Sequence, residues 1–351
     1  MTSTALTTQA TPATPPTLPA ALPATTCAVV FHELGGPEVL KTEEVPLPAP
    51  GPGEVLLRVE AIGLNRAEAM FRSGGYYYRP TLPGSRLGYE AAGVVAAVGE
   101  GVTAFVPGDR VLSAGTFDFG VHGVYAERVV LPESSLVPAP ADADPVTAAA
   151  LWVTYATAYG GLVETGGLAP GDQVLITGGS SGVGTAAIQT ARRVGAVPIV
   201  TTRGTAKREQ LRELGAAHVI STDTEDLVEE VKRFTGGAGV RLAFDGIGGP
   251  GFTAVGDALT PGGTVVAYGW LDPRPMVLSM NWPLTVRTFG NGLLARDPGY
   301  RRRAAAFLGA GLASGELAPV VAKVFEGLEA MGDAHRLMES NAHTGKIVVR
   351  V

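Results

Sequence analysis

The feature that most constrains the fold is a regular alternation of short apolar runs and helical stretches in the second half of the chain. Five runs rich in β-branched residues recur every 20–25 residues, and the stretches between them carry apolar residues at helical spacing. Parallel strands joined by helices form a sheet that is covered on both faces, so this region predicts a doubly wound α/β sheet. The expected strands begin at Gln173, Val197, Ala217, Arg241 and Thr264, and the expected helices span 185–194, 207–214 and 226–234.

A glycine-rich run, GSSGVG at 179–184, lies between the first of these strands and the helix that follows it. Glycines at such a turn allow the backbone to approach a pyrophosphate, whose charge is met by the N–H groups of the helix N-terminus. A serine stands where the G-x-G-x-x-G pattern has its second glycine, so the next glycine supplies the close approach. The run predicts a dinucleotide site, with a simple tight turn as the alternative. Its residues are Gly179, Ser180, Ser181, Gly182, Val183 and Gly184.

The end of the second strand bears on which dinucleotide is bound. Enzymes that use NAD usually carry a carboxylate about 20 residues after the loop, but the segment TTRGTAKR at 201–208 has none. Its basic side chains would stabilise a 2′-phosphate by charge-assisted hydrogen bonds, which favours NADPH over NADH. For each basic residue the alternative is a solvated helix start. The candidate contacts here are Thr202, Arg203 and Lys207, and those at the ends of strands four and five are Asp245, Tyr268 and Gly269.

The chain before this region is typical of a compact β-rich domain, because short β runs between 27 and 140 are separated by Gly and Pro. With 46% hydrophobic and 17% charged residues the chain can bury a large core. The single cysteine, Cys27, excludes an internal disulfide and every Cys-rich zinc cluster. A net charge of −6 does not provide the excess of positive charge that attracts nucleic acid or an anionic membrane, so we expect neither as a partner.

Residues 1–26 consist mainly of Thr, Ala and Pro, and the first charged side chain is Glu33. The segment lacks a charged n-region and an unbroken apolar run, so we expect a disordered tail rather than a signal or transit peptide. No apolar run reaches the ~18 residues that cross a bilayer. We therefore expect a cytoplasmic protein.

Six motifs in order make the chain resemble the medium-chain dehydrogenase/reductase superfamily, in its zinc-independent quinone oxidoreductase and enoyl reductase branch. The resemblance implies an α/β fold in which a GroES-like β-rich catalytic domain (27–150 and 291–351) surrounds an inserted Rossmann domain (151–290). The active site would lie between them. The motifs are AIGLNRAEAMFRSGGYY from Ala61, LGYEAAGVVAAVGEGV from Leu87, VPGDRV from Val106, LAPGDQVLITGGSSGVG from Leu168, FDGIGG from Phe244 and ESNAHTGKIVV from Glu339.

The zinc-dependent members of this superfamily hold a catalytic zinc through a Cys, a His and a third ligand. At the matching positions this chain has Asn65, Tyr89 and an apolar stretch around Val153. A catalytic zinc needs three protein ligands and an open position, so no metal site is predicted.

Without a Lewis acid, a conjugated acceptor is easier to reduce than a simple ketone, because a hydrogen-bond donor can stabilise the enolate that forms. In the enoyl reductase relatives a tyrosine after the GxN segment is the proposed proton donor. The loop RSGGYYYRP offers Tyr76 or Tyr77 in that role, with an aromatic lining of the cleft as the alternative. By the same resemblance Asn65 faces the nicotinamide and positions the substrate carbonyl, or is a buried structural amide.

Weaker candidates complete the prediction. Thr154 and Lys346 are expected near the cofactor, and His122 and Trp270 in the substrate pocket. We expect an NADPH-dependent reductase of an enone, enoyl thioester or quinone, assembled as a homodimer or homotetramer by analogy with relatives. The alternatives are a zinc-independent carbonyl or alcohol oxidoreductase of natural-product tailoring and a non-redox NADPH-binding protein or cyclase.

Overall fold

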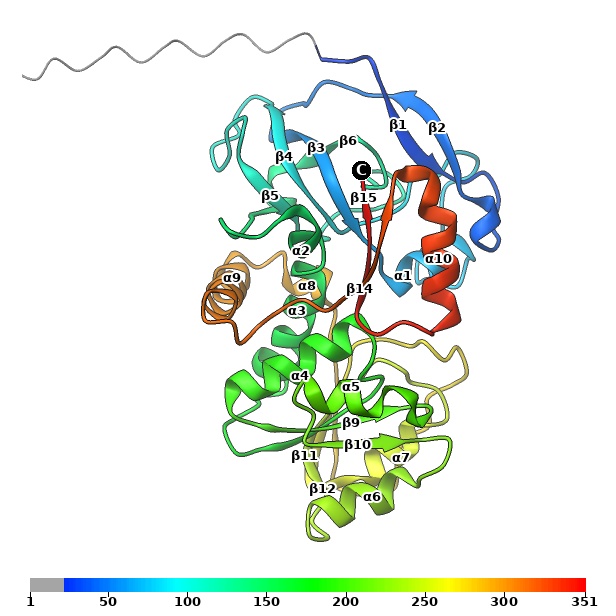
Figure 1. The fold of residues 1–351 in the computed structure, drawn as a ribbon, viewed down its shortest axis with the longest axis vertical. Coiled ribbons are helices and arrows are strands. Elements are labelled where there is room, and N and C mark those ends of the chain that lie inside the picture. Colours follow the sequence, from blue (N-terminus) through cyan, green and yellow to red (C-terminus); the bar gives the residue numbers. More distant parts are fainter. Residues whose placement is uncertain (1–21) are drawn as a thin grey trace, which may run out of the picture.

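Two large β-sheets lie one beyond the other along the long axis of the molecule (Figure 1). They belong to a computed structural model that describes residues 22–351, apart from the side chains of residues 293 and 294. The tail predicted for residues 1–26 therefore falls mainly outside the described residues. Its last two residues, Thr25 and Thr26, belong to strand β1 (Thr25–Val30).

The predicted doubly wound sheet is confirmed. Six parallel strands take the order β10-β9-β8-β11-β12-β13, and they are β8 (Gln173–Ile176), β9 (Val197–Thr202), β10 (His218–Ser221), β11 (Val240–Asp245), β12 (Leu259–Ala267) and β13 (Thr285–Thr288). The covering helices are α4 (Gly182–Val194), α5 (Arg208–Glu213, after a 3-10 turn at Thr205–Lys207), α6 (Leu227–Phe234) and α7 (Phe252–Asp257). Successive strand residues point to opposite faces, so Val174 and Ile176 pack against α4 and α5 while Leu175 packs with α6 and α7.

The second sheet has seven strands in the order β14-β15-β3-β4-β5-β7, with β6 paired to β3. They are β3 (Glu54–Gly63), β4 (Ala91–Val98), β5 (Arg110–Ser113), β6 (Arg128–Pro132), β7 (Leu136–Pro138), β14 (Val321–Glu326) and β15 (Lys346–Arg350). A separate ribbon joins β1 to β2 (Lys41–Pro46), and 3-10 turns span Pro37–Val39, Glu133–Ser135 and Leu328–Ala330. Helix α1 (Arg66–Arg72) follows β3 directly and faces the parallel sheet's end of the molecule (Figure 1).

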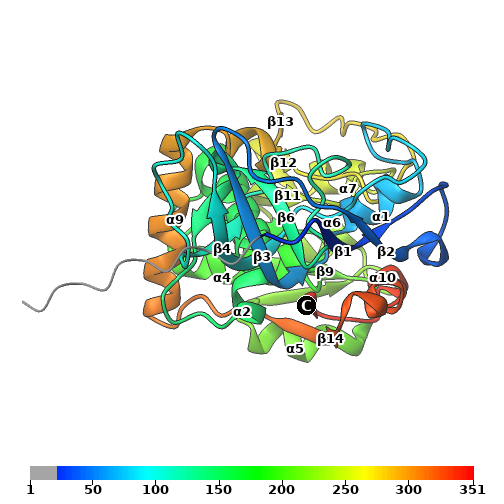
Figure 2. The same ribbon diagram turned by 90° about the horizontal axis from the view of Figure 1, so that it is seen from above.

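The chain passes from the second sheet to the parallel one through α2 (Pro145–Ala149) and α3 (Trp152–Tyr159), which continues as a π-helix (Gly160–Thr165). It returns through α8 (Asn291–Leu294), α9 (Pro298–Ala313) and α10 (Met331–Ser340). Helix α9 lies beside α3, where the Tyr300 hydroxyl donates to the Ala156 carbonyl at 2.6 Å. The return ends when β15 pairs antiparallel with β3 and parallel with β14, so the C-terminal strand lies in the interior of the second sheet. Figure 2 shows the C-terminus close to β14.

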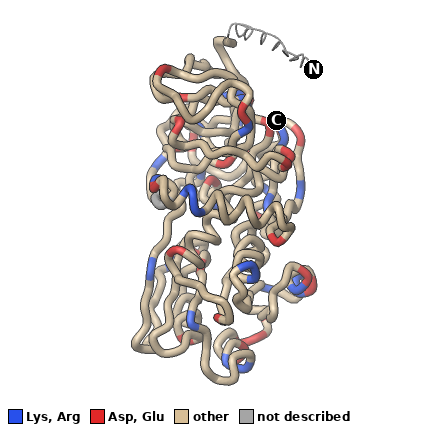
Figure 3. The backbone as a smooth tube through the Cα atoms, turned by 90° about the vertical axis from the view of Figure 1, so that its left-hand side faces the viewer, with Lys and Arg blue, Asp and Glu red and all other residues tan. Residues whose placement is uncertain are grey.

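Two predicted boundaries are wrong by three residues or more. Strand β12 begins at Leu259 rather than Thr264. Helix α4 begins at Gly182 rather than Thr185, because the Ser181 side chain caps it by accepting from the Gly184 N–H at 3.0 Å. Basic and acidic residues are interspersed along the tube in the view of Figure 3.

Among the described residues, no helix is both long enough and apolar enough to cross a membrane.

Candidate functional site

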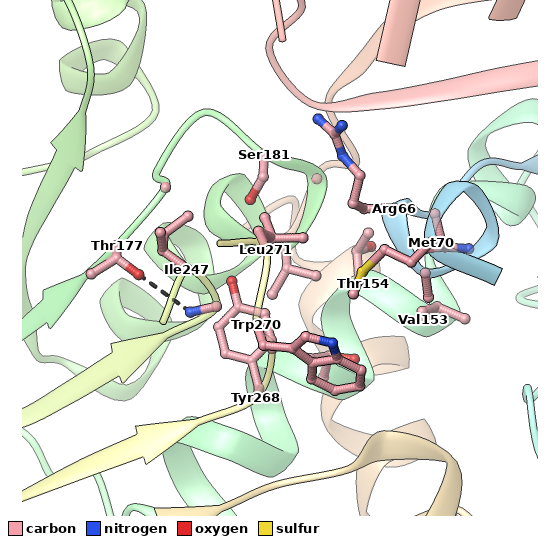
Figure 4. A pocket seen from close by; sticks show the side chains of 18 of the residues that line it. Arg66, Met70, Val153, Thr154, Thr177, Ser181, Ile247, Tyr268, Trp270 and Leu271 are labelled. Carbon is pink, nitrogen blue, oxygen red and sulfur yellow. Dashed lines mark hydrogen bonds between the residues drawn. The ribbon is translucent and has the colours of Figure 1, made fainter. Parts of the chain in front are cut away.

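A cavity of about 830 Å³ lies between the two sheets and is lined from both. Residues 64–67 and 76–78 contribute from the side of β3 and α1, and residues 178, 180–183, 201–204, 206 and 207 from the side of the parallel sheet. Figure 4 shows Arg66 and Met70 on one wall facing Ser181 and Ile247 on the other. The cavity is therefore the one place where most of the predicted site residues come together.

The glycine-rich loop forms the wall at the N-terminus of α4. Ser180, Ser181, Gly182 and Val183 line the cavity there, beside the partial positive charge of the helix end. A Cβ on Gly182 would lie 3.1 Å from Thr154 Cγ2, 3.5 Å from Lys346 Cδ and 3.8 Å from the Gly345 carbonyl oxygen, so the absence of a side chain keeps this part of the cavity open.

The other two glycines of the loop, Gly179 and Gly184, do not line the cavity. A Cβ on Gly184 would meet the Gly178 carbonyl oxygen at 2.3 Å, so this glycine allows the helix to pack against the strand end. Both glycines were expected to contact a cofactor. Their place outside the cavity indicates that they shape the turn instead.

Three cationic side chains line this part of the cavity, and two of them follow β9 directly. Arg203 is exposed on the cavity rim and has no hydrogen-bonded acceptor among the described residues, while Thr202 lines the cavity beside it. Lys207 is already engaged, because its Nζ donates to the Asn341 carbonyl at 2.8 Å and to the His343 carbonyl. Burial, followed by the charge of Arg203, lowers the pKa of Lys207. Arg203 is thus the cation best placed for a phosphate.

Arg66 is the third cation, and the sequence analysis did not identify it. It begins α1, lines the cavity and donates to the Met338 carbonyl at 3.0 Å. Burial lowers its pKa, Glu339 opposes this shift, and the charge of Arg203, which lines the same cavity, lowers the pKa further. No sequence signal links residue 66 to residue 203, since the first begins α1 beside one sheet and the second follows β9 of the other.

The ends of β11 and β12 form the far wall. The buried Asp245 accepts from Thr177 Oγ1 at 2.6 Å and from the Gly248 N–H at 2.8 Å, and burial raises its pKa. Asp245 therefore organises the turn at 246–248, where the Gly246 N–H also donates to Thr177 Oγ1 at 3.3 Å (Figure 4).

Tyr268, Gly269 and Thr154 line the same end of the cavity. The Tyr268 ring stacks on Phe244 with ring centroids 4.1 Å apart. Thr154 Oγ1 donates to the Ala150 carbonyl at 2.8 Å, so its methyl group is the part that meets Gly182.

The floor of the cavity is a buried ionic cluster. Lys346 Nζ donates to Asn65 Oδ1 at 2.6 Å and forms an ion pair with Glu90. Asn65 uses both amide hydrogens, toward the Gly63 carbonyl at 3.2 Å and Glu90 Oε2 at 3.1 Å. Asn65 therefore has no donor left for a substrate carbonyl, which corrects the expectation that it positions one.

Aromatic rings form the wall opposite the dinucleotide loop. Tyr76 is half-buried and stacks on Trp270, with ring centroids 5.9 Å apart and an angle of 20°. Tyr77 is 74% exposed at the rim. Burial raises the pKa of Tyr76, so its hydroxyl stays protonated at neutral pH.

Tyr89 is a further hydroxyl in the cavity that the sequence analysis treated only as a missing zinc ligand. Its ring stacks on Phe119 with centroids 5.2 Å apart, and burial raises its pKa well above the ordinary value. The resemblance could have identified Tyr89. It stands where the metal-dependent relatives have a zinc ligand, so it should lie in the site as that ligand does.

His122 does not line this cavity, contrary to the expectation. The turn at 118–123 directs Phe119 inward and His122 outward, where its Nδ1 lies 3.1 Å from the Val130 carbonyl oxygen. The Asp118 side chain and carbonyl hold this turn by accepting from the N–H groups of Gly120 and His122.

A buried carboxylate, Glu68, supports the site from behind. Its oxygens accept from the N–H of Asn65 at 2.7 Å, the N–H of Tyr89 at 3.2 Å and the Tyr125 hydroxyl at 2.6 Å. Tyr125 is in turn 3.1 Å from His335 Nε2. Burial raises the pKa of Glu68 to about 7, so its charge changes near neutrality.

Among residues 22–351, no three His, Cys, Asp or Glu side chains are grouped so that they could hold a metal ion.

The fold and the cavity define a class, the two-domain dehydrogenases and reductases with an inserted dinucleotide-binding sheet. Residues 51–141 match the family model "Alcohol dehydrogenase GroES-like domain", and residues 182–289 match "Zinc-binding dehydrogenase". Human quinone oxidoreductase is 31% identical over 330 residues, which cover 92% of this chain and 97% of that protein. The chain therefore belongs to the medium-chain dehydrogenase/reductase superfamily, in its zinc-independent quinone oxidoreductase branch.

Other relatives match over part of the chain. The rat synaptic vesicle membrane protein VAT-1 homolog is 40% identical over 243 residues, which span 69% of this chain but only 58% of that protein. A 2-haloacrylate reductase from Burkholderia sp is 38% identical over 247 residues, 69% of this chain and 72% of the relative.

Solved structures agree over nearly the whole chain. Quinone oxidoreductase from Pseudomonas syringae pv. Tomato DC3000 superposes with a TM-score of 0.86 at 32% identity, covering 93% of this chain and 100% of that one. The Escherichia coli quinone oxidoreductase complexed with NADPH gives a TM-score of 0.85 at 29% identity, with the same coverage.

Glu68 makes the stability of the protein depend on pH. Because the folded chain binds the Glu68 proton more tightly than the unfolded chain, stability falls as the pH rises from about 4.5 to about 7. We expect the free energy of unfolding of the wild type to decrease over this range by up to ~3 kcal/mol relative to Glu68→Gln, which cannot titrate. Urea unfolding of both proteins across the range measures the difference, and parallel curves would contradict it.

Proposed function

We propose that the protein is an NADPH-dependent, zinc-independent reductase that transfers a hydride to an activated C=C bond of an enone, an enoyl thioester or a quinone. The observation that carries this proposal is the single cavity that joins a dinucleotide loop, a rim cation and an aromatic wall with protonated tyrosine hydroxyls. The quinone oxidoreductases and the 2-haloacrylate reductase among the relatives support a reductase of this kind.

The residues present fit NADPH. The N-terminus of α4 would hold the pyrophosphate, and Arg203 would hold the 2′-phosphate, with Arg66 on the opposite wall. The ends of β11 and β12, with Asp245, Tyr268 and Gly269, would accommodate the nicotinamide and its ribose. When bound, NADPH supplies the hydride, and structures of two relatives contain NADPH.

The chain's own part in the chemistry is to orient the acceptor and supply a proton. Hydride arriving at the β-carbon moves the electron pair of the C=C bond toward the carbonyl oxygen, and the α-carbon then takes a proton. Tyr76 is the better donor of the two candidates, because it is half-buried in the cavity whereas Tyr77 is mainly exposed. Trp270, stacked on Tyr76, would hold a flat acceptor beside it.

The assembly is proposed to be a homodimer formed through the parallel sheet. Strand β13 is its edge, and its four residues are all exposed. The segment before it exposes a run of large apolar side chains that a second copy would cover. They are Val277, Leu278, Met280 and Trp282, each more than half exposed.

A change at Arg203 tests the cofactor assignment. We expect Arg203→Ala to raise the Kd for NADPH by ~10- to 100-fold while leaving that for NADH unchanged, since one charge-assisted contact to the 2′-phosphate is lost. Fluorescence titration with both nucleotides measures this. Arg302→Ala, which removes an exposed arginine on α9, is the matched control. Equal weakening of both nucleotides would contradict a 2′-phosphate contact.

Single tyrosine changes test the proton donor. We expect Tyr76→Phe to lower kcat by ~100-fold with a quinone or enone substrate and Tyr77→Phe to change it less than ~2-fold, in line with the usual contribution of a general acid. Steady-state NADPH oxidation provides the measurement. If neither variant is slower, the proton comes from water or another group. A wild type that binds NADPH but oxidises it with no quinone, enone or enoyl thioester refutes the proposed reaction itself.

A charge placed in the apolar segment tests the dimer. Met280 is 76% exposed, so Met280→Asp should leave the subunit folded but convert the dimer to a monomer in light scattering after size exclusion. Val106→Asp, at a position 61% exposed in the other domain, should not change the mass. A wild type that is already monomeric at micromolar concentration would refute the assembly.

A further inference from the structure

The Lys346 ammonium is the one cation built into the floor of the cavity. The side chain is 4% exposed, yet it lines the cavity. Its stem passes beside the dinucleotide loop, where Cδ would lie 3.5 Å from a Cβ on Gly182. The outer end of the side chain lies beside β3 of the catalytic domain, where Cε would lie 2.8 Å from a Cβ on Gly63. Lys346 thus crosses from the cofactor wall to the catalytic domain.

Its partners hold the ammonium in place and are themselves saturated. Glu90 Oε1 accepts from the Val153 N–H at 2.8 Å, and Glu90 Oε2 accepts from Asn65 and Lys346. Asn65 Oδ1 takes the second ammonium hydrogen. An ammonium has three donors, and among the described residues only these two acceptors bind it. One N–H of Lys346 is left for a ligand in the cavity.

Stability alone does not account for this arrangement. A buried ion pair loses so much hydration that well-packed apolar side chains of similar volume often stabilise a protein as well or better. The cluster also sits at Asn65 and beside Val153, two of the three positions that hold zinc in the metal-dependent branch. A positive charge at this point would act as an electrophile that polarises a substrate oxygen.

We propose that Lys346 Nζ forms an oxyanion-binding site for the carbonyl oxygen of the substrate, with Glu90 and Asn65 as positioning residues. This inference rests on the proposed C=C reduction. Hydride adds to the β-carbon, the C=C electron pair moves to form the enolate, and its oxygen is held by the third N–H of Lys346. The proton that completes the reduction reaches the α-carbon from a separate donor, so Lys346 keeps its own protons.

The test uses a variant that removes the ammonium without stranding its partner. Lys346→Met alone leaves Glu90 buried and unpaired, so the informative protein is the double variant Lys346→Met/Glu90→Gln, whose amide can still accept from Val153. The matched control is Arg350→Met/Glu326→Gln, which removes an exposed ion pair between the neighbouring strands β15 and β14. Thermal unfolding should show that both doubles are folded.

Two readouts then separate an oxyanion site from a cofactor contact. We expect the double variant to lose ~100-fold or more in kcat, as enzymes do when one oxyanion donor is removed, while its Kd for NADPH stays within ~2-fold of the wild type. The second readout needs no turnover. 4-Nitrophenol bound to the enzyme with NADP⁺ mimics the enolate, and its visible absorbance shows the ionised fraction. The wild type and the control should favour the nitrophenolate by ~10-fold more than the double variant does.

The outcomes are distinct. The proposal is overturned if the folded double variant keeps its kcat and its nitrophenolate preference, or if its only loss is in NADPH affinity, which would assign Lys346 to the cofactor. If the wild type reduces no acceptor, the proposed reaction fails, whereas loss of the nitrophenolate preference in the double variant still establishes the oxyanion site.

Discussion

The antiparallel pairing of β15 with β3 is the constraint on which the site depends. It brings the last residues of the chain back to the strand that precedes Asn65, and it carries the segment 341–346 past the dinucleotide loop. There the Gly345 N–H donates to the Ser180 carbonyl at 2.9 Å, and Lys207 binds the carbonyls of Asn341 and His343. These backbone contacts tie the parallel sheet to the catalytic domain, so the width of the cavity is determined by the C-terminal return rather than by the two linking segments alone.

On the catalytic side of the cavity, two carboxylates, Glu68 and Glu90, accept the hydrogen bonds of the buried donors. Asn65 and Tyr89 project into the cavity, and the N–H groups of both residues are held by Glu68 from behind. Glu90, one residue after Tyr89, holds Lys346, the Asn65 amide and the Val153 N–H. Two carboxylates therefore anchor the backbone on either side of the positions where a metal-dependent relative has its ligands. The local geometry can persist without a metal because hydrogen bonds to carboxylates are strong when both partners are buried.

Sequence reasoning succeeded where a local pattern decides the structure. The alternation of apolar runs predicted five strands of the parallel sheet, since strands buried on both faces must be apolar throughout. It placed the loop at 179–184 correctly but began α4 three residues late, because glycines were taken as turn residues although Ser181 caps the helix before them. The motifs that carry the family resemblance gave the arrangement of the two domains. The last residues of the tail were misjudged because the pairing of Thr25 with Pro46 is not visible in composition.

The same reasoning failed where the role of a polar side chain depends on whether its hydrogen-bond donors already have partners. Asn65, Lys207 and Lys346 were all candidates, the first and third through the family resemblance. Asn65 has no free donor, Lys207 is bound by carbonyls of the segment that follows α10, and Lys346 retains one donor. His122 and Phe119 are close in sequence but face opposite sides of one turn. Which donors remain free depends on long-range pairs such as 65 with 346 and 207 with 343. A single sequence does not contain those pairs, and for a polar cavity they determine the chemistry more than the residue types do.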